Sequence, residues 1–451
     1  MHRRKQNLRK AAGAGFSFLQ FISGALGLLF LLSGRVASAQ IPDPGSELNK
    51  ILAEHTQSRL RLMFEFRARP EARTGNNFGL SQDLENPLFR TRIGAQLDAT
   101  GWFRISAMGQ DARAPEYGRP APTSARDTMD LQEGYLEFFA KRKDGFGAVF
   151  GREMISLGEG RLIGDPQWSN TSRTFDAARL YYRLPHVRLE ALMVSIVKIR
   201  PDDFNRPDLG DRVWGTYDSF SNLIPKGTVE VYLLRHDQNR PGGFTGTGRL
   251  GINTIGVRAV GPLPGSFNYS IESVAQNGKT GLVDHHGYAW FSAVSRSIPW
   301  RLPLDLEVEY KYASGSKNSA VHDGTFDQLY AADHDKFGHA DLFGWRNLHN
   351  LRSLDTWHIT KQVALNFMYD NWWLASPTDA LYNGSGAAIV RSPKGTAGRH
   401  VGQEADVFAT YHTSGWVFGA GFAHLFAGEF LRQTTPGVNT RYLYLFQSYT
   451  F

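Results

Sequence analysis

The chain has 451 residues and no cysteine, and its 50 lysines and arginines outnumber its 43 aspartates and glutamates. The lack of cysteine excludes disulfides and thiol chemistry, and beyond the N-terminus no apolar run approaches the roughly 18 residues that a membrane-spanning helix requires. Two classes remain: a large secreted β-protein and a β-barrel in a membrane.

Residues 1–39 are predicted to be a secretory signal peptide that is removed. Basic residues cluster at positions 2–10, an apolar run follows at 16–32, and Ala37-Ser38-Ala39 forms an A-x-A cleavage site. This is the order of parts in a signal peptide. The apolar run is also about long enough for a membrane anchor, which takes roughly 17–25 residues, but the cleavage site and the polar residues 40–44 favour removal.

Removal of this segment changes the charge of the protein. Residues 1–39 contain six basic residues and no acidic residue, so the formal net charge falls from +7 to +1. A nucleic-acid-binding surface requires a basic excess on the folded part of a protein, and we therefore expect no nucleic-acid partner. Residues 40–56 are predicted to form a short periplasmic lead-in, and residues 57–451 are predicted to form one barrel.

Strict alternation of polar and apolar residues begins at Arg59. Side chains in a strand point alternately to opposite faces, and a helix does not keep a period of two over ten residues. One face of the first predicted strand carries Arg59, Arg61, Met63, Glu65, Arg67 and Arg69, and the other carries Leu60, Leu62, Phe64, Phe66 and Ala68. The polar faces of the next two strands include Arg90, Arg92 and Arg104.

Similar segments continue to the end of the chain and bring the predicted total to roughly eighteen strands, with a range of 16–18. Beyond the first three, near 59–69, 89–98 and 103–110, they lie near 130–141, 146–154, 174–183, 186–199, 211–221, 227–236, 249–260, 266–277, 286–296, 304–312, 345–355, 361–374, 403–413, 416–425 and 440–451. Many exceed the five or six residues usual for globular strands, and aromatic residues sit near their ends, as at membrane interfaces. We therefore predict an all-β fold, a transmembrane antiparallel barrel with an even number of strands.

The alternative to a membrane barrel is a soluble antiparallel sheet with one face in water, which gives the same alternation. A sheet in lipid must close, because each unpaired backbone group there costs several kcal/mol. Short joins such as 100–101 and 414–415 alternate with long ones, as expected of an outer-membrane barrel. The long segments 155–173 and 313–344 are both candidates to fold inward and narrow the pore.

The last predicted strand ends the chain at Phe451. Counting back in twos from Phe451 gives a mostly apolar face of Tyr449, Gln447, Leu445 and Leu443. This ending resembles the C-terminal signal of bacterial outer-membrane barrels, a closing strand with a terminal aromatic residue. The resemblance implies that the barrel-assembly machinery is a partner and recognises Phe451.

The polar faces of the first three strands are rich in arginine. In a barrel of 16–18 strands with an aqueous channel, inward-facing Arg59, Arg61, Arg67, Arg69, Arg90, Arg92 and Arg104 would form a positive wall. Arginine binds carboxylates through paired hydrogen bonds, and basic rings favour anions in pores. Glu307 and Glu309 would face them from a distant strand. The alternative is an ordinary solvated lumen face.

Nothing in the sequence requires an enzymatic function. Glu307 and Glu309 share a strand face and could imitate a glycosidase pair, which needs a separation of about 5 Å or 6.5–9.5 Å, but a barrel wall explains them more simply. His285-His286 lacks the spacing of metal ligands. We expect no catalysis, no cofactor and no metal.

Residues 151–176 closely resemble a hallmark of the alginate-export porin family. That pattern is a Gly-Arg-Gln strand end, then Gly, Arg-Leu-Ile-Gly, a Trp and Arg-x-Phe-Asp. The matching residues are Gly151, Arg152, Gly158, Arg161, Leu162, Gly164, Trp168, Arg173, Phe175 and Asp176, while Glu153 stands where the family has Gln. Two further blocks resemble the family, one from Phe326 to Asn347 and one from His424 to Phe430.

The resemblance implies an eighteen-stranded outer-membrane channel that carries anionic polyuronate through an arginine-lined constriction. It also implies that Arg152, Arg161 and Arg173 contact substrate carboxylates, with Arg179 a weaker candidate. The alternative is that the loop is clamped for stability, for example by Arg173 with Asp176 or Asp165. An outer-membrane channel for anionic saccharides or small organic anions is therefore the leading prediction. The alternatives are a general or aromatic-compound uptake porin, and a secreted polysaccharide-binding or polysaccharide-cleaving β-protein.

Overall fold

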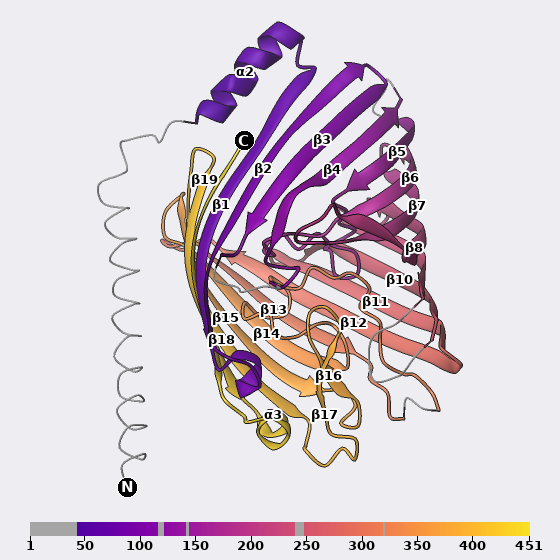
Figure 1. The fold of residues 1–451 in the computed structure, drawn as a ribbon, viewed down its shortest axis with the longest axis vertical. Coiled ribbons are helices and arrows are strands. Elements are labelled where there is room, and N and C mark those ends of the chain that lie inside the picture. The colour runs from indigo at the N-terminus through magenta and orange to yellow at the C-terminus, as the bar shows by residue number, and fades with distance from the viewer. Residues whose placement is uncertain (1–42, 116–120, 141–143, 240–247, 319–320) are drawn as a thin grey trace.

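The computed structural model describes residues 43–115, 121–140, 144–239, 248–318 and 321–451, so the predicted signal peptide lies outside the described residues. These residues form an antiparallel sheet of 18 strands that closes into a barrel (Figure 1). The predicted fold class and strand number are confirmed. No helix in the described part of the chain is long and apolar enough to cross a membrane.

The barrel strands follow one another around the sheet in chain order, each antiparallel to its neighbours. They are β1 (Leu60–Thr74), β2 (Leu84–Thr100), β3 (Phe103–Arg113), β4 (Asp127–Phe139), β5 (Gly145–Glu153), β6 (Phe175–Leu184), β7 (Val187–Lys198), β8 (Arg206–Ser221), β9 (Thr228–Gln238), β10 (Leu250–Leu263), β11 (Phe267–Thr280), β12 (Val283–Ile298), β13 (Leu304–Ala313), β14 (Leu348–His358), β15 (Val363–Leu374), β18 (His400–Thr413), β19 (Trp416–Ala427) and β20 (Thr440–Thr450). The smaller elements are α2 (Pro44–Thr56), the 3-10 turn η1 (Asn76–Gly79), the hairpin strands β16 (Ala380–Tyr382) and β17 (Ala388–Arg391), and α3 (Glu429–Thr434).

Pairing of the last strand with the first closes the barrel. In this seam Glu65 of β1 lies opposite Thr450 of β20, and the terminal Phe451 ring stacks on Phe64 with 5.7 Å between ring centres. The closure leaves no open edge, as the energetics of a sheet in lipid require. The secreted β-protein with one wet face is therefore set aside.

The predicted lead-in is largely the helix α2, which lies at the seam on the end of the barrel that carries Phe451 (Figure 1). Pairing between β1 and β20 stops before Leu62, whose backbone N–H donates to Asn49 Oδ1 and whose carbonyl accepts from Asn49 Nδ2, both at 2.9 Å. The hydroxyl of Tyr449 donates to Asp43 at 2.8 Å. The helix thus satisfies backbone groups that the finished strand pairing leaves over. The division into lead-in and barrel domains stays a prediction.

The two ends of the barrel differ in their connections (Figure 1). Turns such as 185–186 and 414–415 lie at the end that carries α2 and the C-terminus, here called the short-turn end. Segments 154–174, 314–347 and 375–399 lie at the opposite, long-loop end. The first strands extend further than the alternation predicted, because β1 runs to Thr74 and β2 begins at Leu84, which leaves residues 75–83 between them.

The outer face of the barrel is apolar and exposed. Phe146, Leu180 and Ile93 are 76%, 56% and 65% exposed, which marks the lipid-facing side of their strands because large apolar side chains rarely face water in such numbers. The side chains at the alternate positions point inward, and many of those at the long-loop end contact the long loops. Strand parity therefore assigns each polar side chain to the lumen or to the lipid face.

Candidate functional site

The segment between β5 and β6, residues 154–174, leaves the wall and crosses the lumen. Its first half reaches the far wall, where the Glu159 carboxylate accepts from Ser270 Oγ of β11 at 3.1 Å. Its second half lies against β2 and β3, where Asn170 Nδ2 donates to the Phe89 carbonyl at 3.1 Å. Contacts on both sides make this segment a bar across the channel.

Four arginines of the wall hold this segment in place, and they are called the arginine clamp below. They are Arg67 and Arg69 of β1 and Arg90 and Arg92 of β2, each at most 5% exposed. Arg67 Nη1 donates to the Gln167 carbonyl at 2.7 Å, and Arg90 Nη1 donates to the Ser169 carbonyl at 2.9 Å. The clamp therefore binds the backbone of the loop directly.

The clamp carries more positive than negative charge. Glu65 accepts from Arg90 Nε at 2.7 Å and pairs with Arg92 at 3.1 Å, while Glu71 pairs with Arg69 at 3.2 Å. Two carboxylates thus accompany four guanidinium groups, and the remaining hydrogen bonds go to neutral carbonyl and amide oxygens. A net positive wall results.

The second long segment, 314–347, lies against the first on its long-loop side. Ile163 and Tyr330 form a parallel bridge, with Tyr330 N donating to the Leu162 carbonyl at 2.7 Å. The segment is tied to the β8–β9 wall by His236, which contacts Asp327 of the segment at 2.7 Å. Both candidate loops therefore fold inward, where the sequence left the choice between them open.

A polar cavity of about 670 Å³ lies on the long-loop side of the clamp, and we call it the vestibule. Its lining includes Arg69, Glu71, Arg73, Trp168, Arg173, Asp333 and His334. Arg73 pairs with Asp341 at 3.7 Å. The Arg69 guanidinium carbon lies 4.1 Å from the centre of the Trp168 ring, and the Trp168 and His334 rings stack with 4.2 Å between their centres. Three guanidinium groups thus converge on one cavity.

Arg173 is the least compensated of the three. Its Nη1 donates to the carbonyls of Gly164 and Ala331, both at 3.1 Å, and burial lowers the pKa of its guanidinium from the ordinary value, although arginine keeps its charge at neutral pH. Burial raises the pKa of the nearby Asp333 to about 8. Asp333 is therefore mostly neutral at pH 7, and the charge of Arg173 faces the vestibule.

Comparison with known proteins places the chain. The sequence model of the alginate export family matches residues 58–444. The chain belongs to the alginate export family. No curated protein matches it. Family membership together with the closed barrel makes it a porin of the bacterial outer membrane, with the short-turn end on the periplasmic side, and points to a channel rather than an enzyme.

Solved porins of Pseudomonas aeruginosa share the fold. OpdK, determined with vanillate, is 10% identical with a TM-score of 0.62 over 87% of this chain and 98% of its own. OccK2 (OpdF), determined with glucuronate, is 10% identical with a TM-score of 0.58 over 87% and 96%. OccK11 (OpdR) is 12% identical with a TM-score of 0.60 over 87% and 96%. At these identities the likeness concerns the fold.

The predicted site residues of this porin fall into separate groups. Arg67, Arg90 and Arg92 meet in the clamp, while Arg59 and Arg61 are exposed at the periplasmic end of β1. Arg104 pairs with Asp98 at 2.6 Å and with Glu137 at 3.1 Å, below the clamp.

The two loop arginines have different partners. Arg161 lies 3.3 Å from the centre of the Phe291 ring and pairs with Glu159 at 2.8 Å. Arg173 lines the vestibule. It donates to backbone carbonyl oxygens and makes no hydrogen bond to Asp165 or Asp176, the partners that the clamp alternative suggested.

Arg152 lies apart from the lumen. It shares the strand face of Phe146 and Phe150, which point outward, and it binds Asp176 on the same outer face at 2.7 Å. The hallmark motif grouped Arg152 with the loop arginines, while its alternation with the two phenylalanines indicated the lipid side.

The acidic pair faces the lumen from β13, and β20, β19, β18, β15 and β14 lie between that strand and β1. Glu309 is paired with Lys311 and lies 3.6 Å from Arg352. Its charge is thus largely balanced within its own wall. Glu307 projects from the same strand face, two residues away.

Arg73 is a vestibule residue that sequence reasoning missed. It continues the series Arg67, Arg69 and Glu71 by one more step of two, so the alternation already placed it in the lumen. Trp168 and His334 were noticed only as motif matches. Their role depends on contact between two segments far apart in the chain, which no local pattern reports.

Proposed function

We propose that this porin passes anionic saccharides, alginate-like polyuronates in particular, or small organic anions through an arginine-lined path. The observation that carries the proposal is the convergence of Arg69, Arg73 and Arg173 on the vestibule directly above the net positive clamp. Guanidinium groups bind carboxylates in paired, charge-assisted hydrogen bonds, and basic residues in a narrow lumen favour anions. The path needs no cofactor and no covalent chemistry.

Within this proposal the residues have different parts. Arg69, Arg73 and Arg173 receive the carboxylate, the clamp sets the field of the constriction, and Arg61 and Arg104 continue the path toward the periplasmic end. Glu307 and Glu309 line the opposite wall, and Arg161 of the bar contacts Phe291 of that wall. The assembly partner that recognises Phe451 remains part of the same proposal.

The second candidate is an uptake channel for aromatic carboxylates. It is supported by the fold shared with OpdK, whose structure was determined with vanillate. The family favours the polyuronate, because alginate is the cargo that the family description names. Block of ion current by vanillate and by oligomeric uronate, each added to the same reconstituted channel, discriminates between the two.

Reversal potentials in planar bilayers test the charge argument. Under a salt gradient the wild-type channel is expected to prefer anions, and Arg173→Gln is expected to lower that preference. Arg296→Gln is a matched control, since Arg296 shares the outward strand face of Val294 and is exposed. Cation preference of the wild type, or an equal loss in the control, would overturn the proposal.

A further inference from the structure

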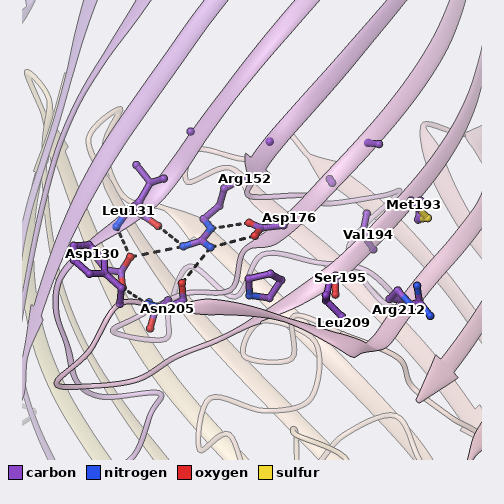
Figure 2. A pocket seen from close by; sticks show the side chains of 16 residues that line it. Asp130, Leu131, Arg152, Asp176, Met193, Val194, Ser195, Asn205, Leu209 and Arg212 are labelled. Carbon is purple, nitrogen blue, oxygen red and sulfur yellow. Dashed lines mark hydrogen bonds and ion pairs between the residues drawn. The ribbon is translucent and has the colours of Figure 1, made fainter. Parts of the chain in front are cut away.

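A groove of about 740 Å³ is cut into the outer face of the barrel at its long-loop end (Figure 2). Several of the side chains of β4–β8 that line it share their strand faces with lipid-exposed residues. Arg152 lies on the face of Phe146, which is 76% exposed, and Arg212 lies on the face of Trp214, which is 51% exposed. The groove therefore opens toward the membrane and is separate from the vestibule.

The groove exists because the lumen bar takes chain away from the wall. β5 ends at Glu153 and pairs with β4 only from Gly134 onward, so the long-loop part of β4 has no β5 partner. The connection 199–205 folds over this part of β4 instead. Thr128 Oγ1 donates to the Pro201 carbonyl at 2.8 Å, and this hydrogen bond holds the connection 199–205 over the groove.

Two arginines line the groove, and only Arg152 bonds through its side chain to other residues of the protein. Arg152 Nε and Nη2 donate to the two carboxylate oxygens of Asp176 at 2.7 and 3.2 Å, and Nη2 also donates to the Asn205 carbonyl at 3.3 Å. Arg212 is exposed, and its guanidinium makes no hydrogen bond or ion pair with the residues that the structure describes. In Figure 2 its side chain lies beyond Ser195, and no dashed line reaches it.

The carboxylates of the groove do not neutralise Arg212. Asp176 is occupied by Arg152, and Asp130 accepts from the backbone N–H groups of Leu131 and Asn205, both at 2.5 Å. Asp237, which lies opposite Arg212 in the β8–β9 pairing, is taken by Arg235 at 3.1 Å. One uncompensated guanidinium therefore remains at the edge of the groove.

Much of the remaining lining of the groove is apolar and exposed. Leu131, Met193 and Leu209 on the strands are 42%, 53% and 69% exposed, and Phe204 on the connection 199–205 is 68% exposed. Apolar side chains placed beside a cation at the level of the head groups suit a lipid with acyl chains and a phosphate. In an outer-membrane barrel the long-loop end lies on the outer leaflet side.

We propose that this groove binds a phosphorylated glycolipid of the outer leaflet, with an acyl chain along Leu131 and Met193 and a phosphate on Arg212. Phe204 of the connection 199–205 and Leu209 of β8 insert beside it at the membrane surface. The binding follows from the position of the chain in the outer membrane and is independent of what the lumen transports.

The test uses folded, detergent-purified full-length protein stripped of lipid and then exposed to lipid A, a phosphorylated acylated disaccharide. Native mass spectrometry counts the lipid retained, and the heat-modifiable gel shift reports folding. Wild type is expected to retain one lipid A, and Arg212→Ala is expected to weaken retention roughly tenfold or more, the effect of one lost charge-assisted hydrogen bond. Arg441→Ala is the matched control, because Arg441 is also exposed and outward-facing at the long-loop end but lines no part of the groove.

A second variant separates shape from charge. Ala178→Phe places a ring inside the groove, whose lining includes Ala178, and is expected to abolish retention while the gel shift persists. Dephosphorylated lipid A is expected to bind as weakly to wild type as lipid A binds to Arg212→Ala. The proposal is overturned by folded wild type that retains no lipid A, by equal retention in Arg212→Ala and Arg441→Ala, or by a groove occupied by another protein in native membranes.

Discussion

The two segments that fill the lumen are held in place by different kinds of interaction. Residues 154–174 are gripped through their backbone by the arginine clamp. Residues 314–347 instead bury a cluster of aromatic rings, in which Phe326, Phe343 and Trp345 have no exposed surface. The first segment depends on hydrogen bonds from charged donors, and the second depends mainly on apolar burial.

This difference decides which segment an anion can act on. A carboxylate is a stronger acceptor for guanidinium than a carbonyl oxygen, so an anionic cargo competes with Gln167 and Ser169 for the clamp. No cargo competes for the place of Trp345 among its neighbours. We therefore expect the first segment to respond to anions and the second to act as a fixed scaffold.

The largest effect is expected from opening a hole in the scaffold. Trp345→Ala removes a fully buried ring that contacts Phe326 at 5.5 Å between ring centres and donates from Nε1 to the Tyr312 carbonyl at 3.0 Å. Such a truncation costs about 3–5 kcal/mol. Denaturant unfolding of the reconstituted barrel measures the loss. Trp300→Ala is the control, since Trp300 is 59% exposed and its removal leaves no cavity.

The next effect concerns the clamp. In the double variant Arg67→Ala with Arg90→Ala, residues 167–169 lose their principal donors from β1 and β2. Each charge-assisted bond contributes about 1.5–3 kcal/mol, so the bar should detach and single-channel conductance should rise several-fold.

The control for the clamp variant keeps the number of arginines equal. Arg59→Ala with Arg61→Ala removes two exposed side chains at the periplasmic end of the same strand and should change conductance little. A folded clamp variant that conducts like wild type would show that other contacts, such as those of Asn170, hold the bar.

The barrel itself was predictable because every strand has lipid on one face and a polar lumen on the other. Lipid outside and polar surroundings inside impose a period of two that each segment carries locally, so all eighteen strands were found. Arg67 and Arg90 were placed correctly on the inner face for the same reason. The position of Arg73 followed from the same rule and needed only one more step along the strand.

The contacts of the site were not predictable from local pattern. Arg67 meets Gln167 across a sequence separation of 100 residues, and the bridge between Ile163 and Tyr330 joins two loops. Alternation shows the direction of a side chain and is silent on its partner. For Arg152, the motif led to a predicted substrate contact, whereas its side chain lies on the outer strand face that it shares with Phe146.

A smaller effect should distinguish the segments directly, because the native chain has no cysteine. Ser169→Cys reports on the bar, and Ser316→Cys, at a buried serine of the scaffold, is its matched partner. Millimolar glucuronate is expected to speed thiol labelling of the first variant by competing for the clamp, and to leave the second unchanged. Equal acceleration at both sites would mean that the two segments move together.

The smallest expected effect is a pH dependence inside the scaffold. Burial raises the pKa of Asp333 to about 8, from about 3.9 in an unfolded chain, so the folded state holds this proton more tightly. The stability it contributes is complete below about pH 4 and is lost as the pH rises through about 8.

Asp333→Asn removes that dependence, because the amide cannot ionise. Wild-type open-channel current should therefore become noisier between pH 7 and pH 9, as an ionised Asp333 loosens the turn in which its carbonyl accepts from Lys336 N and Phe337 N, both at 2.8 Å. The variant should stay quiet over the same range. If wild type and variant change alike, the titrating group lies elsewhere and the scaffold is as insensitive to pH as it is to anions.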